Sequence, residues 1–261
     1  MTTSATPPAG PPARLPAVRA RGLTKVYGSG PSAVEALVDA DMDVPAGEFT
    51  AIMGPSGSGK STLMHLLAGL DSVTRGQAFI GDLDITTLDD RELTRLRRDR
   101  VGFVFQSFNL LPMFTAEQNI VLPLELAGRP VDRAWFDTLV TTLALGDRLD
   151  HRPSELSGGQ QQRVAIARAL IAKPDVVFAD EPTGNLDSRA GAQVLSFLRR
   201  SVRELGRTVI MVIHDPSAAA YADRVVLIAD GRIAGEISDP TPESVLAGLD
   251  ALRTLDEVAV P

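Results

Sequence analysis

Residues 54–61, which read GPSGSGKS, match the pattern G-x-x-x-x-G-K-[ST] in full. Glycines at these positions let successive backbone N–H groups turn inward and form a nest for phosphate oxygens at the start of a helix. Lys60 would reach the β- and γ-phosphates of a nucleotide, and Ser61 would hold Mg²⁺. The alternative is a glycine- and serine-rich loop with an incidental lysine, which does not explain the full pattern. We therefore expect nucleotide contacts from Gly54, Pro55, Ser56, Gly57, Ser58, Gly59, Lys60, Ser61 and Thr62.

Two adjacent carboxylates, Asp180 and Glu181, follow the apolar run 176–179. Side chains alternate along a strand, so these carboxylates cannot share one role if the extended backbone continues. Asp180 suits a contact with Mg²⁺, whereas Glu181 suits polarising the water that attacks a phosphate. Apolar strands often end in a charged turn that has no chemical role. The phosphate-loop pattern upstream favours the functional interpretation.

A third motif, LSGGQ at residues 156–160, opens a predicted helix. Ser157 is a good N-cap residue, and the two glycines after it would admit a negative group close to the positive end of the helix dipole. Capping alone explains Ser157, but it does not explain Gly158, Gly159 and Gln160 together.

Apolar strands alternate with amphipathic helices along the chain, which predicts an α/β fold with a mostly parallel sheet covered on both faces. The predicted strands are residues 47–53, 101–105, 176–179 and 208–213, with a hairpin formed by 224–229 and 232–237. The predicted helices are residues 60–70, 158–172 and 188–205. Between residues 116 and 145, we expect Pro123 and residues 128–130 to break the helical pattern.

Composition narrows the class of protein. The 261 residues carry a net charge of −7 and contain no cysteine, which excludes a disulfide scaffold and a cysteine-built zinc site. The acidic balance argues against nucleic acid as a partner. The longest apolar runs are far short of the roughly 18 residues that a membrane span needs, so we expect a soluble chain. Residues 1–16 include five prolines and predict a disordered tail.

Taken together, the phosphate loop, LSGGQ and the strand ending in Asp-Glu resemble the nucleotide-binding domain of ATP-binding cassette (ABC) proteins, over about residues 19–237. This resemblance implies a P-loop NTPase core with a mostly parallel sheet, an antiparallel β subdomain and an inserted α-helical subdomain. The implied division is a tail at 1–16, a nucleotide-binding domain at 17–240 and a C-terminal helix and tail at 241–261. The helical subdomain would cover about 91–157.

The resemblance also implies roles for single residues. Gln106 would sense Mg²⁺ and the attacking water, His214 would touch the γ-phosphate, and Tyr27 would stack on adenine. Each has a simpler explanation by itself: an exposed polar side chain, a solvated histidine and an aromatic residue at a strand end. The implied catalytic residues are Glu181, His214, Gln106 and Lys60, and the implied metal contacts are Ser61, Gln106 and Asp180.

The family pairs two such domains head to tail when ATP binds. The resemblance therefore implies a homodimer in which Ser157, Gly158, Gly159 and Gln160 contact the ATP held by the phosphate loop of the other copy. Closure would then depend on the γ-phosphate, and hydrolysis would release it.

Finer features resemble the ATPases of lipoprotein-release and macrolide-export systems. These features are residues 108–112 (FNLLP), 119–124 (NIVLPL) and 180–188 (DEPTGNLDS). The expected partner is a membrane permease on a separate chain, with this chain bound peripherally at the cytoplasmic face. The apolar segment 107–114 would either dock that permease or pack the helical subdomain. A soluble regulatory or repair ATPase and an importer ATPase are the alternatives.

Overall fold

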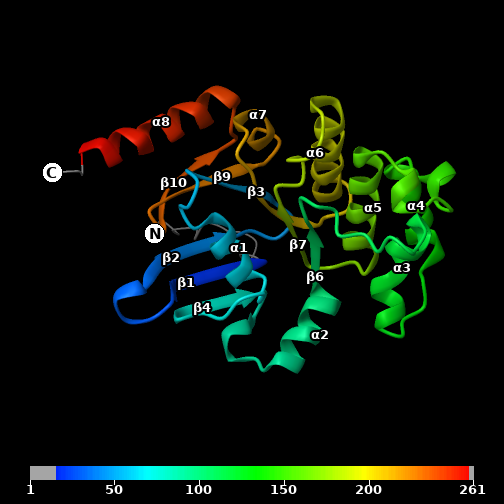
Figure 1. The fold of residues 1–261 in the computed structure, drawn as a ribbon, viewed down its shortest axis with the longest axis horizontal. Coiled ribbons are helices and arrows are strands. Elements are labelled where there is room, and N and C mark those ends of the chain that lie inside the picture. The colour runs from blue at the N-terminus through cyan, green and yellow to red at the C-terminus, as the bar shows by residue number, and fades with distance from the viewer. Residues whose placement is uncertain (1–15, 259–261) are drawn as a thin grey trace, which may run out of the picture.

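The computed structural model describes residues 16–258, with side chains described up to residue 252 (Figure 1). The predicted tail at 1–16 therefore lies, except for Pro16, outside the described residues. Two sheets and a group of helices make up the described part, with the helical group standing to one side of the sheets.

The larger sheet has six strands in the order β10-β9-β3-β8-β7-β6. Five of them are parallel, and β10 pairs antiparallel with β9, so the predicted mostly parallel sheet and its hairpin are confirmed. The strands are β3 (Phe49–Met53), β6 (Val101–Val104), β7 (Val176–Asp180), β8 (Thr208–Val212), β9 (Arg224–Ala229) and β10 (Arg232–Ser238). Every residue of β3 and β8 is buried, as expected for a parallel strand covered on both faces.

The smaller sheet has four antiparallel strands in the order β2-β1-β4-β5. These strands are β1 (Val18–Tyr27), β2 (Val34–Val44), β4 (Arg75–Ile80) and β5 (Leu83–Asp84). Helix α1 (Lys60–Leu67) lies between the two sheets, and its Leu63 and Leu67 share one core cluster with Ile52 of β3 and Phe178 of β7. This core positions the start of α1 at the end of β3.

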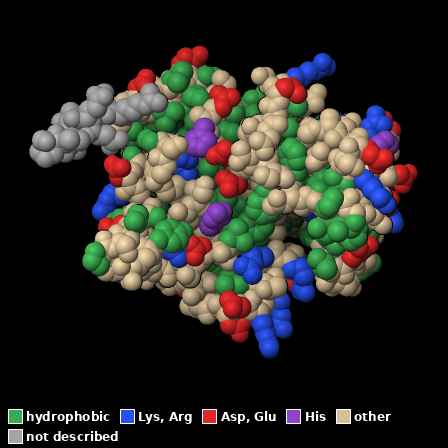
Figure 2. Space-filling model, viewed as in Figure 1, with side chains coloured by type: hydrophobic (Ala, Val, Ile, Leu, Met, Phe, Trp, Pro, Cys, Tyr) green, Lys and Arg blue, Asp and Glu red, His purple; other side chains and the backbone are tan. Residues whose placement is uncertain are grey.

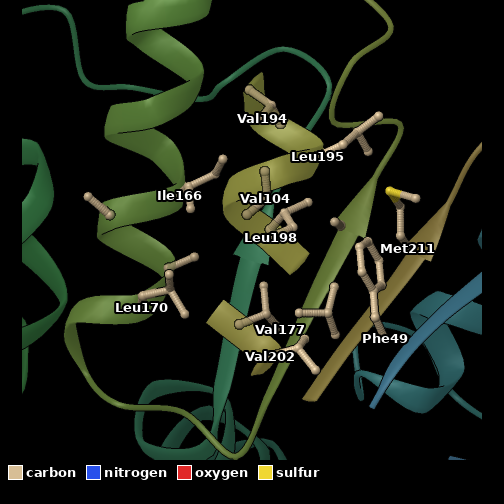
Figure 3. Close-up of a cluster of buried hydrophobic side chains, with 14 of the residues drawn as sticks. Phe49, Val104, Ile166, Leu170, Val177, Val194, Leu195, Leu198, Val202 and Met211 are labelled. Atoms are coloured by element: carbon tan, nitrogen blue, oxygen red, sulfur yellow. The ribbon is translucent and has the colours of Figure 1, made fainter. Parts of the chain in front are cut away.

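The opposite face of the six-stranded sheet packs against α5 (Gly158–Ile171) and α6 (Ser188–Arg203). Side chains alternate along each strand, so Phe49 and Val177 point to this second cluster while their neighbours point to the first. Figure 3 shows Ile166 and Leu170 of α5 and Leu198 of α6 meeting these strand residues. The two helices therefore have fixed positions relative to the strand ends.

Three further helices complete the part of the fold beside the sheets: α2 (Asp90–Arg100), α3 (Ala116–Leu126) and α4 (Arg133–Thr142). The expected break at Pro123 is wrong, because this proline lies inside α3. Its missing N–H leaves one helical bond unmade, but Ile120 and Leu124 are buried in the cluster that also contains α5, and this packing outweighs the local preference. The expected break at 128–130 coincides with the end of α3.

Strand β6 at 101–104 belongs to the large sheet, and Leu96 of α2 packs in the cluster between the sheets. The expected bounds of the helical subdomain, about 91–157, stay a prediction. At the other end of the chain, α7 (Pro216–Ala219) precedes β9, and α8 (Pro242–Val258) lies over β9 and β10 with Val245 buried. Single 3-10 turns lie at η1 (Gly30–Ser32), η2 (Ile85–Thr87), η3 (Gly146–Arg148) and η4 (Pro153–Glu155). None of the helices described between residues 16 and 258 has the length and apolar content to cross a bilayer.

Candidate functional site

The phosphate loop connects the carboxyl end of β3 to α1, as the sequence predicted. Two positions of the loop require glycine because the backbone of other strands comes too close for a Cβ atom. A Cβ on Gly54 would lie 2.0 Å from the Ile228 carbonyl oxygen, and one on Gly59 would lie 2.4 Å from the Ala36 carbonyl oxygen. Gly59 also has φ 100°. The backbone of β9 and β2 therefore packs so closely against the loop that neither glycine could carry a side chain.

That pocket is a cavity of about 240 Å³. It is lined by Ala36, Ser56, Gly57, Gly59, Lys60, Ser61, Thr62 and His214. Ala36 is a contributor that sequence reasoning missed, and no local signal marks it, because strand β2 reaches the loop only through the packing of the two sheets. The pocket combines backbone N–H groups, hydroxyls and one cation, which are the groups that bind phosphate oxygens.

Lys60 lies at the start of α1 and is only 5% exposed. Its Nζ donates to the Gly54 carbonyl oxygen at 3.0 Å and to the Pro55 carbonyl oxygen at 2.6 Å. Burial lowers the pKa of this ammonium group, and the nearby carboxylates Glu181 and Asp180 oppose the shift. Neutral carbonyls compensate a buried cation less well than an anion does, so a phosphate would be the stronger partner.

The two carboxylates lie where β7 and β8 end side by side. Glu181 donates its backbone N–H to the Val212 carbonyl oxygen at 3.0 Å and has φ 44°, a left-handed conformation that ends the strand. The extended alternation expected for Asp180 and Glu181 therefore stops here. Both carboxylates act electrostatically on Lys60. Burial is the main cause of the raised pKa of Asp180, and the charge of His65 opposes it.

His214 follows β8 and pairs with Glu181. Its Nε2 lies 2.6 Å from Glu181 Oε1, and both side chains remain partly exposed at 47% and 27%. His214 also lines the phosphate pocket, so the structure brings this histidine, Glu181 and Lys60 to one edge of the sheet. Figure 2 shows acidic and histidine side chains gathered near the middle of the same face.

Gln106 lies just after β6, which is parallel to β7. A Cβ on Gly184 would lie 2.7 Å from Gln106 Nε2, so the glutamine amide packs directly on the turn that follows Glu181. Asn185 Nδ2 donates to the Gln106 carbonyl oxygen at 3.0 Å. The expected neighbours Gln106 and Glu181 therefore share one edge of the sheet.

Tyr27 ends β1 and is 41% exposed. Its hydroxyl donates to Asp71 at 2.7 Å, and the Lys25 ammonium lies 4.8 Å from the ring centroid. Tyr27 also interacts with Thr62, which lines the phosphate pocket. The ring thus stands beside the pocket, although it is not one of the residues that line it.

LSGGQ begins α5 as predicted, and Ser157 caps the helix. The Gln160 N–H donates to Ser157 Oγ at 3.3 Å, while the Ser157 N–H donates to Gln160 Oε1 at 2.8 Å. Gly158 lies against Leu186, and a Cβ on Gly159 would come within 3.1 Å of Ala190 Cβ. None of these four residues lines the phosphate pocket of the described chain. The fold therefore keeps them apart from the phosphate loop of the same copy.

The donor set fits Mg²⁺ only in combination with a phosphate. Ser61 and Asp180 offer the oxygen ligands that this ion prefers. Among the described residues, no group of three or more histidine, aspartate or glutamate side chains could hold a metal ion. Burial of the Asp180 carboxylate nonetheless leaves an anionic group that a nearby cation would stabilise.

Comparison with known proteins places this arrangement in a family. Residues 37–184 match the family model described as ABC transporter. The chain belongs to the ABC transporter family. This cassette is 47% identical over 249 residues to the macrolide export ATP-binding/permease protein MacB of Brucella melitensis, covering 95% of this chain and 38% of that protein. The chain thus spans well under half the length of its MacB relatives.

Two other relatives match over nearly their whole length. The lipoprotein-releasing system ATP-binding protein LolD of Anaeromyxobacter dehalogenans is 47% identical over 228 residues, covering 86% of this cassette and 95% of LolD. The solved dimer of the ATP-binding cassette MJ0796 of Methanocaldococcus jannaschii, bound to ADP and Pi, has 40% identity and a TM-score of 0.77, covering 86% and 99% of the two chains. The expected family and fold class are confirmed.

Proposed function

We propose that this cassette hydrolyses ATP to ADP and phosphate and drives a membrane transporter or transmembrane transducer of the export type. The observation that carries the proposal is one pocket at the end of the parallel sheet that Lys60 and His214 line, with Glu181 paired to His214 and acting electrostatically on Lys60. The names of the relatives, which include lipoprotein-releasing and macrolide-export proteins, support the choice of type.

Each residue has a part that follows from its position. Lys60 exchanges its two carbonyl partners for oxygens of the β- and γ-phosphates. Glu181 orients the attacking water and accepts its proton, and His214 holds that carboxylate at the edge of the pocket. Ser61, Asp180 and Gln106 would hold Mg²⁺, which neutralises charge on the phosphates when bound. Tyr27 would carry the adenine beside Thr62.

A second copy of the chain would complete the site. The residues at the start of α5 do not line the phosphate pocket of their own copy, and Gly158 and Gly159 add no side chain there. Two copies arranged head to tail would place each LSGGQ segment on the γ-phosphate bound by the other. The dimeric state of the MJ0796 cassette with ADP and Pi supports this arrangement.

A second groove suits the permease. It has a volume of about 290 Å³ between α2, β6, α3 and α5, and its walls include Arg97, Phe103, Phe105 and Arg168. Figure 2 shows basic side chains gathered over α2. In the apolar segment 107–114, Leu110 packs against the core, whereas Met113 is 62% exposed and would be available to dock the permease.

Peripheral attachment at the cytoplasmic face follows from this docking. A tagged chain would co-purify from washed membranes with a membrane protein. Recovery with soluble proteins only, and absence from the membranes, would favour a regulatory or repair ATPase. A permease recovered together with a solute-binding protein would favour an importer.

Glu181→Gln tests the chemical step. The amide keeps the size of the side chain but cannot take a proton, so we expect ATP turnover to fall by about 10²–10³-fold while ATP still binds. The ATP-bound dimer should accumulate in size-exclusion chromatography. Glu204→Gln, the same change at a side chain that is 55% exposed after α6, serves as the control and should keep its turnover. Undiminished hydrolysis by the Glu181→Gln protein would overturn the assignment.

A further inference from the structure

Gln162 is a buried glutamine outside the sequence motifs described above. It lies on α5, two positions after the last residue of LSGGQ, and is 0% exposed. Its Nε2 donates to the Pro182 carbonyl oxygen at 2.7 Å and to the Phe105 carbonyl oxygen at 3.4 Å. Its Oε1 is buried and has no hydrogen-bond partner within residues 16–258.

The orientation of this amide follows from its partners. Both groups that face the Nε2 atom are carbonyl oxygens, so the flipped amide would bring oxygen against oxygen and lose both hydrogen bonds. A buried oxygen without a partner lowers stability, and an apolar side chain of similar size would avoid that cost. The Gln162 side chain therefore forms hydrogen bonds through Nε2, while Oε1 forms none within the described part of the chain.

The two carbonyls adjoin the residues on which hydrolysis depends. Pro182 directly follows Glu181, and Phe105 directly precedes Gln106. The strands β6 and β7 are paired as far as Val104 and Ala179, and beyond that point the Gln162 amide bridges the two departing chains. One side chain therefore sets the spacing between the two loops at the γ-phosphate end of the site.

The same side chain ties both loops to α5. Ile166 and Leu170 anchor this helix on the large sheet, and its first turn carries Ser157 and Gly159. A displacement of the LSGGQ end is therefore passed to Glu181 and Gln106 through a bond at each loop. Arg168, further along α5, donates to the carbonyls of Phe108 and Asn109, so the helix also holds the far side of the loop that follows Gln106.

We propose that Gln162 is a positioning residue that aligns Glu181 with Gln106 and links both to the LSGGQ end of α5. It touches neither nucleotide nor water and acts through the Pro182 and Phe105 carbonyls. This inference rests on the proposed ATPase function. When the LSGGQ segment of one copy binds the nucleotide held by a second copy, Gln162 would transmit that contact to Glu181 and Gln106 of the copy that carries the LSGGQ segment.

The test compares Gln162→Met and Gln162→Glu with matched changes at Gln193. Gln193 lies on α6, where it is exposed, and belongs to neither loop. Steady-state kcat and KM for ATP are measured on the full chain, at a temperature where circular dichroism shows every variant folded. We expect Gln162→Met to lower kcat by about 10- to 100-fold with little change in KM. The Gln193 variants should keep the wild-type kcat.

Gln162→Glu adds a second measurement, the pH dependence of kcat, which a simple loss of packing would not change. The ionised carboxylate has no hydrogen for either carbonyl, whereas the protonated acid donates one. The kcat of this variant, relative to wild type, should therefore rise as pH falls, and Gln193→Glu should show no such trend.

The outcomes separate the two claims. A Gln162→Met protein with wild-type kcat, or a Gln162→Glu protein whose relative kcat is flat with pH, overturns the positioning role and leaves the ATPase assignment standing. A wild-type chain that does not hydrolyse ATP overturns the proposed function itself.

Discussion

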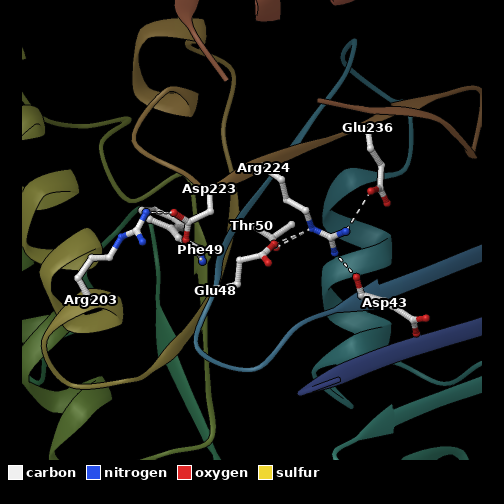
Figure 4. A network of polar contacts seen from close by, with 8 residues as sticks. All are labelled: Asp43, Glu48, Phe49, Thr50, Arg203, Asp223, Arg224 and Glu236. Atoms are coloured by element: carbon white, nitrogen blue, oxygen red, sulfur yellow. Dashed lines mark hydrogen bonds and ion pairs between the residues drawn. The ribbon is translucent and has the colours of Figure 1, made fainter. Parts of the chain in front are cut away.

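Charged groups lie near both ends of the central strand β3, but among the described residues only the cation at the amino end pairs with carboxylates. At its carboxyl end, Lys60 is buried against backbone carbonyls, and Ser58 Oγ has no hydrogen-bond partner among the described residues. At its amino end, Arg224 pairs with Glu48 at 2.9 Å and with Glu236 at 3.0 Å and donates to the Asp43 carbonyl oxygen. Figure 4 shows this second network, in which Arg224 lies between Glu48 and Glu236 and Arg203 faces Asp223.

The charges at the amino end of β3 stabilise the fold, whereas those at the carboxyl end are available to a ligand. Paired charges at the amino end join β3, β9 and β10, and Asp223 extends the network by accepting from the Phe49 N–H and pairing with Arg203. At the carboxyl end, Lys60 is influenced by the charges of Glu181 and Asp180 but forms no ion pair within the described part of the chain, and Ser58 Oγ makes no hydrogen bond there. A folded chain keeps such unmatched groups where a ligand supplies the match. Removing a charge should therefore have opposite consequences at the two ends.

Lys60→Met should give the largest effect. We expect ATP affinity to fall by about 10²-fold or more, because a charge-assisted hydrogen bond to phosphate is lost. The unfolding temperature should stay level or rise, since burial already lowers the pKa of this ammonium and opposes its charged form in the fold. Calorimetric titration with ATP and thermal unfolding measure the two quantities. If Lys60→Met clearly lowered the unfolding temperature and left the ATP affinity unchanged, Lys60 would have a structural role instead of a nucleotide-binding role.

Arg224→Met should give the reverse result with a smaller magnitude. Its side chain is 14% exposed, and removing it leaves Glu48 without its ionic partner. We expect a loss of about 2–4 kcal/mol in the free energy of unfolding, with ATP affinity unchanged. Glu236→Gln is the matched control, because Glu236 is 46% exposed and its pair should contribute less than about 1 kcal/mol. Denaturant titration gives these free energies. A fall in the ATP affinity of the Arg224→Met protein would contradict a purely structural role for Arg224.

Sequence alone predicted the strands of the large sheet and the motif positions, because buried parallel strands and the phosphate loop have strong local patterns. The strands of the smaller sheet were not predicted from the residues, and only the family resemblance implied an antiparallel β subdomain. Pro123 misled it, since packing of α3 on α5 overrides the local effect of a proline. The relation of Asp180 to Glu181 also escaped prediction, because it depends on a left-handed backbone at Glu181 rather than on strand alternation. Gln162 escaped for a different reason: its partners lie 57 and 20 residues away and meet it only in the folded sheet.

The central claim is that each hydrolytic site uses the phosphate loop of one copy and the LSGGQ segment of another. Mixing two inactive variants, Lys60→Met and Ser157→Arg, tests it most directly. A mixed dimer contains one site with an intact phosphate loop and an intact LSGGQ segment on opposite copies, so ATPase activity should reappear on mixing. Activity that stays at the level of the separate variants, while chromatography shows mixed dimers, would contradict a shared site.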